Sequence, residues 1–162
     1  VARRTNLETD AECMLSAWWQ LLTVDKDFLP GWRESHFPGG CSHAGELETS
    51  LYLHLDRENV REDKIKSGTI SYNDENLPHL YTDLFGSSAA ALVSWTSSYS
   101  ETGVLGDAEA ASAEKGKIAY EEAVKQLVTI INWFKDRPCD QRQDKHRQPP
   151  TIPIPWNQQP LS

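Results

Sequence analysis

The chain has 162 residues, of which 38% are hydrophobic and 25% charged, and its formal net charge is −8. These values are those of one soluble globular domain, or of a piece of a larger one. The acidic balance argues against nucleic acid and against anionic membrane surfaces as partners, because the field of the protein repels phosphate groups. No stretch approaches the roughly 18–20 apolar residues that a membrane-spanning helix needs.

The three cysteines, Cys13, Cys41 and Cys139, are too few and too scattered for a disulfide framework. Their spacing matches no zinc motif, so a reducing, cytoplasmic location is expected. The sequence begins at Val1 without a recognisable secretory signal, and a processed or truncated start is expected.

The first predicted element is a strand over the apolar run from Cys13 to Leu22, whose length and paired tryptophans suit a buried strand. Residues 23–42 contain several Pro and Gly and predict a long loop. From His43 to Leu55, leucines recur at every fourth residue, which predicts a short amphipathic helix.

The middle of the chain predicts little regular structure. Residues 67–86 mix Gly, Asn, Asp and Pro and predict an irregular segment with a short strand. A further strand is expected over residues 92–95, followed by a turn-rich loop over residues 97–106.

A long helix is predicted from Asp107 to Phe134, with Asp107 as its N-cap. Gly116 costs helix stability, so we expect it to admit another element closely. The Pro-rich residues 137–162 predict an extended tail. This tail either packs on its own domain, stays loose, or docks as an arm on another subunit.

The residues best suited to chemistry lie between Gly39 and Ser50, where a Gly-rich loop leads into the predicted helix. His43 and Glu48 share no helical face, but they converge if His43 precedes the first turn. A His transfers protons near neutral pH and a Glu binds divalent metals, so an acid–base or metal-linked site fits. The structural alternative is a helix start with Glu at its positive end. His36, in the preceding loop, is expected to reach the same pocket.

Three segments, in order, resemble the creatininase (creatinine amidohydrolase) family. They read S-x-W-W-x-L at residues 16–21, G-G-x-x-H-A-G-E-x-E-T-S-L at residues 39–51, and G-V-x-G-D-x-x-x-A-x-A-E-K-G at residues 103–116. The resemblance implies an α/β fold of three αβα layers with a mostly parallel sheet. It implies that residues 1–136 are the C-terminal part of such a hydrolase domain, whereas residues 137–162 have no counterpart.

The activity that the resemblance implies is metal-dependent hydrolysis of a small polar cyclic amide or a related carbon–nitrogen bond, with cyclic ketones as a further class. The family's proton-transferring His corresponds to His43. Glu48 is expected as a site carboxylate, either a metal ligand or a residue that supports one.

Around this pair, Gly40, Cys41 and Ser42 are the expected substrate-binding residues. Glu46 is expected to be a charge at the helix start. The family's creatinine-contacting Trp-Asp pair is replaced here by Gly39 and Gly40, which argues against creatinine itself as the substrate.

The cofactor that the resemblance implies is a divalent metal, Zn, Mn or Fe, with two ions in the complete site. The family's main ligands lie in E-x-H-G and N-G-H-x-x-N segments of its N-terminal half, and neither segment occurs in this sequence. A second polypeptide carrying that half, or a homo-oligomer such as a hexamer, is therefore expected to complete the site. Two alternatives stay open: a non-catalytic remnant or assembly subunit of this fold, and a partner-binding module that uses the Pro-rich tail.

Overall fold

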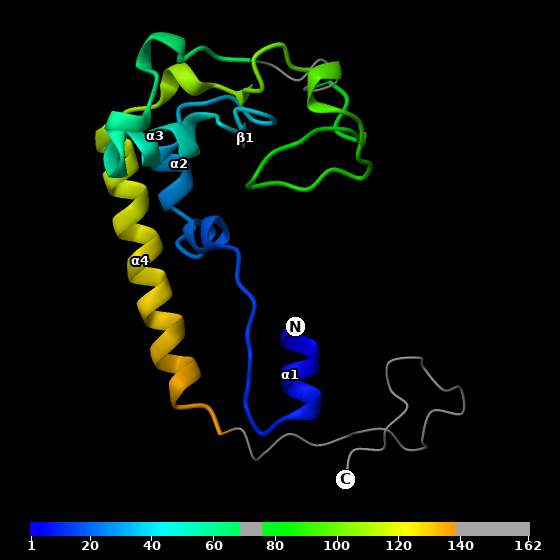
Figure 1. The fold of residues 1–162 in the computed structure, drawn as a ribbon, viewed down its shortest axis with the longest axis vertical. Helices are drawn as coiled ribbons and strands as arrows, with labels where there is room; N and C mark the ends of the chain where they lie inside the picture. The colour runs from blue at the N-terminus through cyan, green and yellow to red at the C-terminus, as the bar shows by residue number, and fades with distance from the viewer. Residues whose placement is uncertain (69–75, 139–162) are drawn as a thin grey trace. The chain divides into compact units, whose positions relative to one another are not determined.

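The computed structural model describes residues 1–68 and 76–138, apart from the side chains of Leu7 and Glu8. Two compact units divide the chain, one formed by residues 1–16 and 132–162, the other by residues 17–131 (Figure 1). The candidate site lies within the second unit. No helix in the described part of the chain is long and apolar enough to cross a membrane.

The α-helices are α1 (Ala2–Glu8), α2 (Phe28–Trp32), α3 (Glu46–Leu55) and α4 (Ala113–Lys135). The strands are β1 (Cys41–His43) and β2 (Leu105–Gly106). Short 3₁₀ helices are η1 (Trp18–Thr23), η2 (Arg57–Asn59), η3 (Glu62–Lys64), η4 (Thr96–Ser98) and η5 (Ala108–Ala110).

The sheet that positions the site is small. β1 and β2 pair antiparallel, with Cys41 opposite Gly106 and His43 opposite Leu105. The α/β class is in keeping with this mixture of helices and strands. The three-layer arrangement with a mostly parallel sheet stays a prediction, because the described residues contain only this antiparallel pair as named strands.

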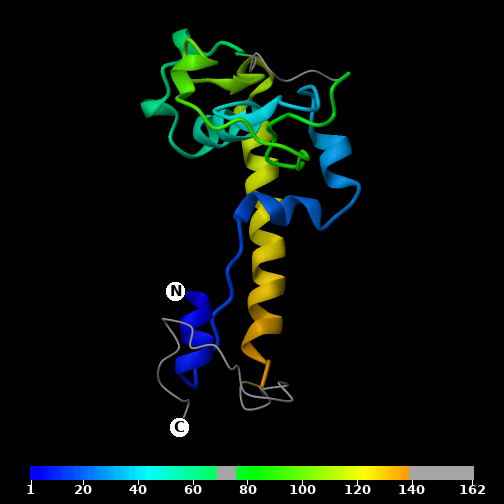
Figure 2. The same cartoon turned by 90° about the vertical axis from the view of Figure 1, so that its right-hand side faces the viewer.

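The core of this unit joins η1, α2, β1, α3 and the first turns of α4. Its buried members are Leu22, Trp32, Cys41, Leu47 and Ala119. Helix α3 lies against the start of α4, and η1 crosses α4 further along in Figure 2.

The predicted close approach at Gly116 is confirmed. A Cβ built at this glycine would collide with the carbonyl oxygen of Ser50 in α3. Glycine is therefore the residue that lets the backbones of α3 and α4 touch.

Two predicted strands are wrong. The run from Cys13 to Leu22 has no strand: residues 13–17 lack regular structure, and Trp18–Thr23 forms η1. A short apolar run does not by itself distinguish strand from helix. The predicted strand at residues 92–95 is an exposed segment without regular structure, so it has no buried face to pair.

Two predicted helix starts move toward the C-terminus. The first helix begins at Glu46, because His43 pairs with Leu105 in the sheet. The long helix begins at Ala113, after η5. The N-cap is Ser112, whose Oγ accepts a hydrogen bond from the backbone N–H of Lys115 at 3.2 Å, as a capping serine does.

The other unit has its own contacts. The side chain of Asn6, in α1, makes two hydrogen bonds to the backbone of Cys13. Its Nδ2 donates to the Cys13 carbonyl at 2.8 Å, and its Oδ1 accepts the Cys13 N–H. Arg137 pairs with Glu12 at 3.0 Å. Most of the predicted Pro-rich tail, residues 139–162, lies outside the described residues.

Candidate functional site

The turn between β1 and α3 presents His43. Ala44 has a φ of 50°, the left-handed region that non-glycine residues rarely enter. Two side chains from the first turn of α3 hold it there. The carboxylate of Glu48 accepts a hydrogen bond from the N–H of Ala44, and Oγ1 of Thr49 donates to its carbonyl at 2.9 Å.

His43 and Glu48 are brought together by this turn. Nδ1 of His43 lies 3.9 Å from Oε2 of Glu48, although the residues are five apart in sequence. The convergence expected from the sequence is therefore present, with His43 at the end of β1. Its side chain is 64% exposed. At 3.9 Å the carboxylate is too far for a hydrogen bond to the ring, so it faces the ring electrostatically.

The three expected substrate-binding residues lie at the start of β1. The carbonyl of Gly40 accepts the N–H of Asp107 at 2.9 Å, and a Cβ at this glycine would overlap Ser35 and His36. The thiol of Cys41 is buried against Ser35, and burial raises its pKa to about 11.

Ser42 is also buried, and the single proton of its hydroxyl has two acceptors within reach, the carbonyl of Gly39 at 3.0 Å and that of Thr82. All three residues thus make protein contacts that shape the loop before His43. Their role in substrate binding stays a prediction.

Glu46 is more than a charge at a helix start, because its side chain is completely buried. Its carboxylate accepts the backbone N–H groups of Glu34 and Ser35 at 2.9 Å each, and pairs with Nζ of Lys115. Burial alone raises the pKa of Glu46, but the hydrogen bonds from Lys115, Ser35 and Glu34 outweigh it and hold the pKa below its usual value. This buried pair ties α4 to the loop before β1.

A second His–carboxylate pair lies at the other end of β1. Nδ1 of His36 is 2.5 Å from Oδ2 of Asp107, and the same oxygen accepts the backbone N–H of His36 at 2.9 Å. This tertiary contact explains why Asp107 does not cap the long helix. The His36 ring is partly exposed, and its reaching the substrate pocket stays a prediction.

Sequence reasoning missed Arg33 and Asp83. Arg33 binds both carboxylate oxygens of Asp83, at 3.1 and 2.7 Å, and the N–H of Gly39 donates to Asp83 at 2.8 Å. The Asp83 side chain is fully buried. No local pattern marks this pair, since 50 positions separate its members. Lys115 appears in the sequence analysis only as the Lys of the A-E-K-G segment, and that motif does not reveal its pairing with Glu46.

The described residues do not by themselves fit a complete metal site. His43 and Glu48 offer two donor side chains, whereas zinc sites in proteins use three or four. Among residues 1–68 and 76–138, no three His, Cys, Asp or Glu side chains lie together in a way that could hold an ion. What the pair offers chemically is an exposed imidazole beside a carboxylate, an arrangement suited to proton transfer.

Comparison with known proteins gives a family match and several similar proteins. The family model described as creatinine amidohydrolase matches residues 1–131. Proteins named mycofactocin precursor peptide peptidase are similar: that of Mycobacterium tuberculosis is 35% identical over 105 residues, 64% of this chain and 38% of the relative. That of Mycobacterium ulcerans is 34% identical over 125 residues, 76% of this chain and 45% of the relative. The chain therefore spans less than half the length of these relatives. No solved structure is significantly similar to it.

Proposed function

Since this chain belongs to the creatinine amidohydrolase family, we propose that it is part of a metal-dependent hydrolase of a carbon–nitrogen bond. In this proposal the chain supplies His43 and Glu48 to the active site. The observation that carries it is the convergence of an exposed His43 ring and the Glu48 carboxylate, 3.9 Å apart, on a strained turn. Strained backbone of this kind is maintained at functional sites at a cost of about 1–3 kcal/mol.

His43 performs the proton transfer. Hydrolysis of an amide breaks the carbon–nitrogen bond, adds the hydroxyl of water to the carbonyl carbon, and returns a proton to the leaving nitrogen. His43 delivers that proton, and Glu48 stabilises the charged imidazole electrostatically. Glu48 also holds the turn, so one carboxylate fixes the position of the ring and faces its charge.

The substrate is a small polar cyclic amide, such as a lactam, or a compound with a related carbon–nitrogen bond, and cyclic ketones are a further class. The mycobacterial relatives are named for action on a precursor peptide, which adds a peptide amide to this class. The divalent ions, Zn, Mn or Fe and two per site, belong to the proposal with ligands mainly outside the described residues. A second polypeptide carrying the family's N-terminal half, or a homo-oligomer such as a hexamer, would bring those ligands. The proposed location is the cytoplasm.

The test is amide hydrolysis by the metal-loaded assembly, comparing His43→Ala with His79→Ala. His79 is an exposed histidine, so its removal controls for the loss of an imidazole. We expect His43→Ala to lower kcat by about 100-fold or more, the usual contribution of a general acid, and His79→Ala to leave it unchanged. Equal activity of the two variants would remove His43 from the reaction. An inactive wild-type assembly would favour a non-catalytic role for this fold.

A further inference from the structure

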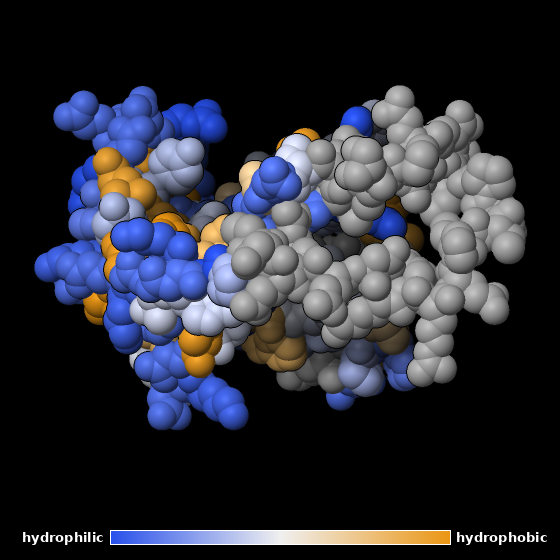
Figure 3. All heavy atoms as spheres, turned by 90° about the horizontal axis from the view of Figure 1, so that it is seen from below, coloured by the Kyte–Doolittle hydropathy of each residue, from blue (hydrophilic) through white to orange (hydrophobic). Residues whose placement is uncertain are grey.

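His36 combines an exposed ring with a fixed position. Polar and charged side chains cover much of the surface seen in Figure 3, with apolar ones between them, so exposure alone does not single out a binding residue. The side chain of His36 is 47% exposed, yet its main chain and one of its ring nitrogens are held by hydrogen bonds. A polar group that is both open and held in place suits the binding of a small ligand, because little conformational entropy is lost on binding.

The main chain of His36 is bonded on both sides. Its N–H donates to Oδ2 of Asp107 at 2.9 Å, and its carbonyl accepts the N–H of Gly40 at 3.0 Å. The same carbonyl accepts a hydrogen bond from the guanidinium of Arg33, which is itself paired with the buried carboxylate of Asp83. The loop that carries the ring is therefore positioned without a ligand.

The ring of His36 is oriented by the same carboxylate. Nδ1 lies 2.5 Å from Oδ2 of Asp107, within hydrogen-bond reach. Because a carboxylate only accepts hydrogen bonds, Nδ1 carries the ring proton, and Nε2 of the neutral imidazole keeps its lone pair. Nε2 is thus a hydrogen-bond acceptor on the side of the ring opposite Asp107.

Three glycines bring the neighbourhood of this ring to the turn that carries His43. A Cβ at Gly106 would collide with the carbonyl oxygen of Gly40 and lie 3.1 Å from Cα of Gly45, so the backbones of the three residues touch. Asp107 directly follows Gly106. His43 precedes Gly45 by two residues, a span of at most about 7 Å. The two His–carboxylate pairs therefore lie around one crossing of the chain.

We propose that His36 is a substrate-binding residue, whose Nε2 accepts a hydrogen bond from the N–H of the substrate's amide. The inference rests on the proposed function, since it names the substrates that the same site prefers. A lactam or another secondary amide offers this N–H, whereas an N-alkylated amide or a cyclic ketone does not. A site that bonds a donor of the substrate rejects analogues without it, because its acceptor is then left unpaired. His43 remains the group that delivers the proton to the leaving nitrogen.

The first test measures binding and needs no turnover. The full chain is labelled with ¹⁵N in its five histidines, and the ring signals of His36 are assigned by their loss in His36→Gln. The chain is titrated with 2-pyrrolidinone, which has an amide N–H, and with N-methyl-2-pyrrolidinone, which lacks it. We expect 2-pyrrolidinone to move the Nε2 signal upfield, and the methylated compound to move it at least about ten-fold less, since it has no donor. Equal shifts with both compounds, or none with either, would overturn the inference.

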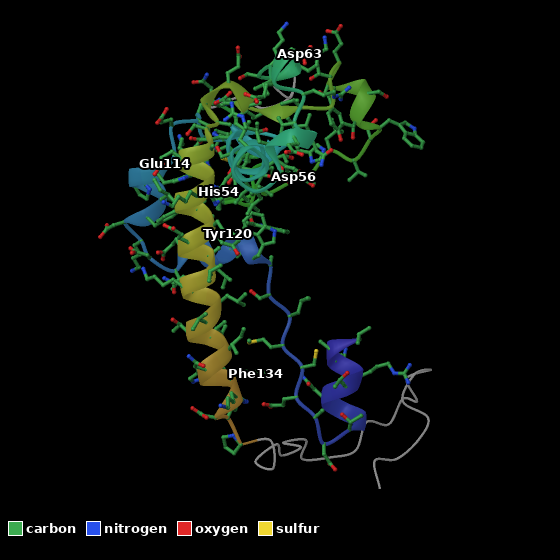
Figure 4. All side chains as sticks on the ribbon, turned by 60° about the vertical axis from the view of Figure 1, so that its left-hand side comes forward. His54, Asp56, Asp63, Glu114, Tyr120 and Phe134 are labelled. Carbon is green, nitrogen blue, oxygen red and sulfur yellow. The ribbon has the colours of Figure 1, made fainter. Side chains whose placement is uncertain are left out.

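His54 is the control within the same labelled chain. It lies on the last turn of α3 beside Tyr120 of α4, with ring centroids 6.1 Å apart (Figure 4). Its ring signals should not distinguish the two compounds. The ligand-free chain gives a further check: at a pH where the ring is neutral, Nδ1 of His36 should have the shift of a protonated nitrogen and Nε2 that of an unprotonated one. The reversed tautomer would overturn the inference, because Nε2 would then donate.

The second test uses the activity of the metal-loaded assembly. The discrimination is the ratio of kcat/KM for an amide with the N–H to kcat/KM for its N-methylated analogue. We expect His36→Ala to lower this ratio at least about ten-fold, mainly through KM, and His54→Ala to leave it unchanged. An active assembly whose ratio His36→Ala does not change counts against this inference alone. An inactive wild-type assembly in which the His36 signals still distinguish the two compounds counts against the proposed function alone.

Discussion

Glu48 lies with Oε2 3.9 Å from Nδ1 of His43 and, in the same conformation, accepts the backbone N–H of Ala44. The carboxylate that faces the candidate catalytic ring therefore also closes the turn that carries it. Loss of this carboxylate has two separable consequences, one for the turn and one for the charge beside His43.

Glu48→Ala and Glu48→Gln separate these consequences. The amide oxygen of Gln still accepts the Ala44 N–H, whereas Ala leaves it without an acceptor. We expect Glu48→Ala to lower the free energy of unfolding by about 1–2 kcal/mol, and Glu48→Gln by clearly less. Urea denaturation of the purified protein measures both. Equal losses would mean that the hydrogen bond does not hold the turn.

The Glu46–Lys115 pair predicts a strong effect of Lys115→Met. This variant leaves the completely buried carboxylate of Glu46 without its cationic partner, and breaking a buried ion pair in this way costs about 3–5 kcal/mol. Lys117→Met, at an exposed position of the same helix, should change stability by less than about 0.5 kcal/mol. If Lys115→Met lowered the free energy of unfolding no more than Lys117→Met, the Glu46–Lys115 pair would not contribute to the stability of the fold.

The same pair predicts the direction of the pH dependence. The folded-state pKa of Glu46 lies below its unfolded value, so the ionised carboxylate stabilises the fold at pH values above the ordinary Glu pKa of about 4.3. This stabilisation is lost as the pH falls through the lower, folded-state pKa. Between neutral and acidic pH, the free energy of unfolding should therefore fall more steeply for the wild type than for Glu46→Gln. Parallel curves for the two proteins would contradict the assignment.

Gly116→Ala tests the close approach of α3 and α4. Alanine favours a helix by about 1 kcal/mol over glycine, but its Cβ would collide with the carbonyl of Ser50. Steric strain should prevail and lower the unfolding free energy by about 1–3 kcal/mol. A stabilised variant in thermal or urea unfolding would mean that the two backbones separate at little cost.

The buried thiol of Cys41 should resist alkylation. Because burial raises its pKa to about 11, very little thiolate exists at pH 8, and the thiolate is the reactive form. We expect iodoacetamide to modify the partly exposed Cys13 at least ten-fold faster than Cys41 in the folded protein, and both at similar rates in urea. Peptide mass spectrometry gives both rates. Comparable rates in the folded protein would show that Cys41 is accessible.

Local sequence patterns predicted the elements that depend on residues close together in the sequence. The leucines at every fourth residue identified α3, and the long apolar periodicity identified α4 to within one residue of its end. The composition around Gly39–Ser50 also identified the segment that holds His43 and Glu48. These features depend on residues a few positions apart, which a linear pattern records.

The tertiary structure decided where local preferences compete with distant partners. Asp107 is a good N-cap by type, yet its carboxylate bonds His36, 71 positions away, and Ser112 caps α4 instead. Glu46 would suit an exposed helix start, yet Lys115 makes it a buried structural charge. The apolar run at Trp18 and Leu21 fits a strand by length, but it forms the 3₁₀ helix η1. The physical reason is shared: burial and ion pairing between distant residues are worth several kcal/mol, more than the fraction of a kcal/mol by which local propensity usually distinguishes one conformation from another.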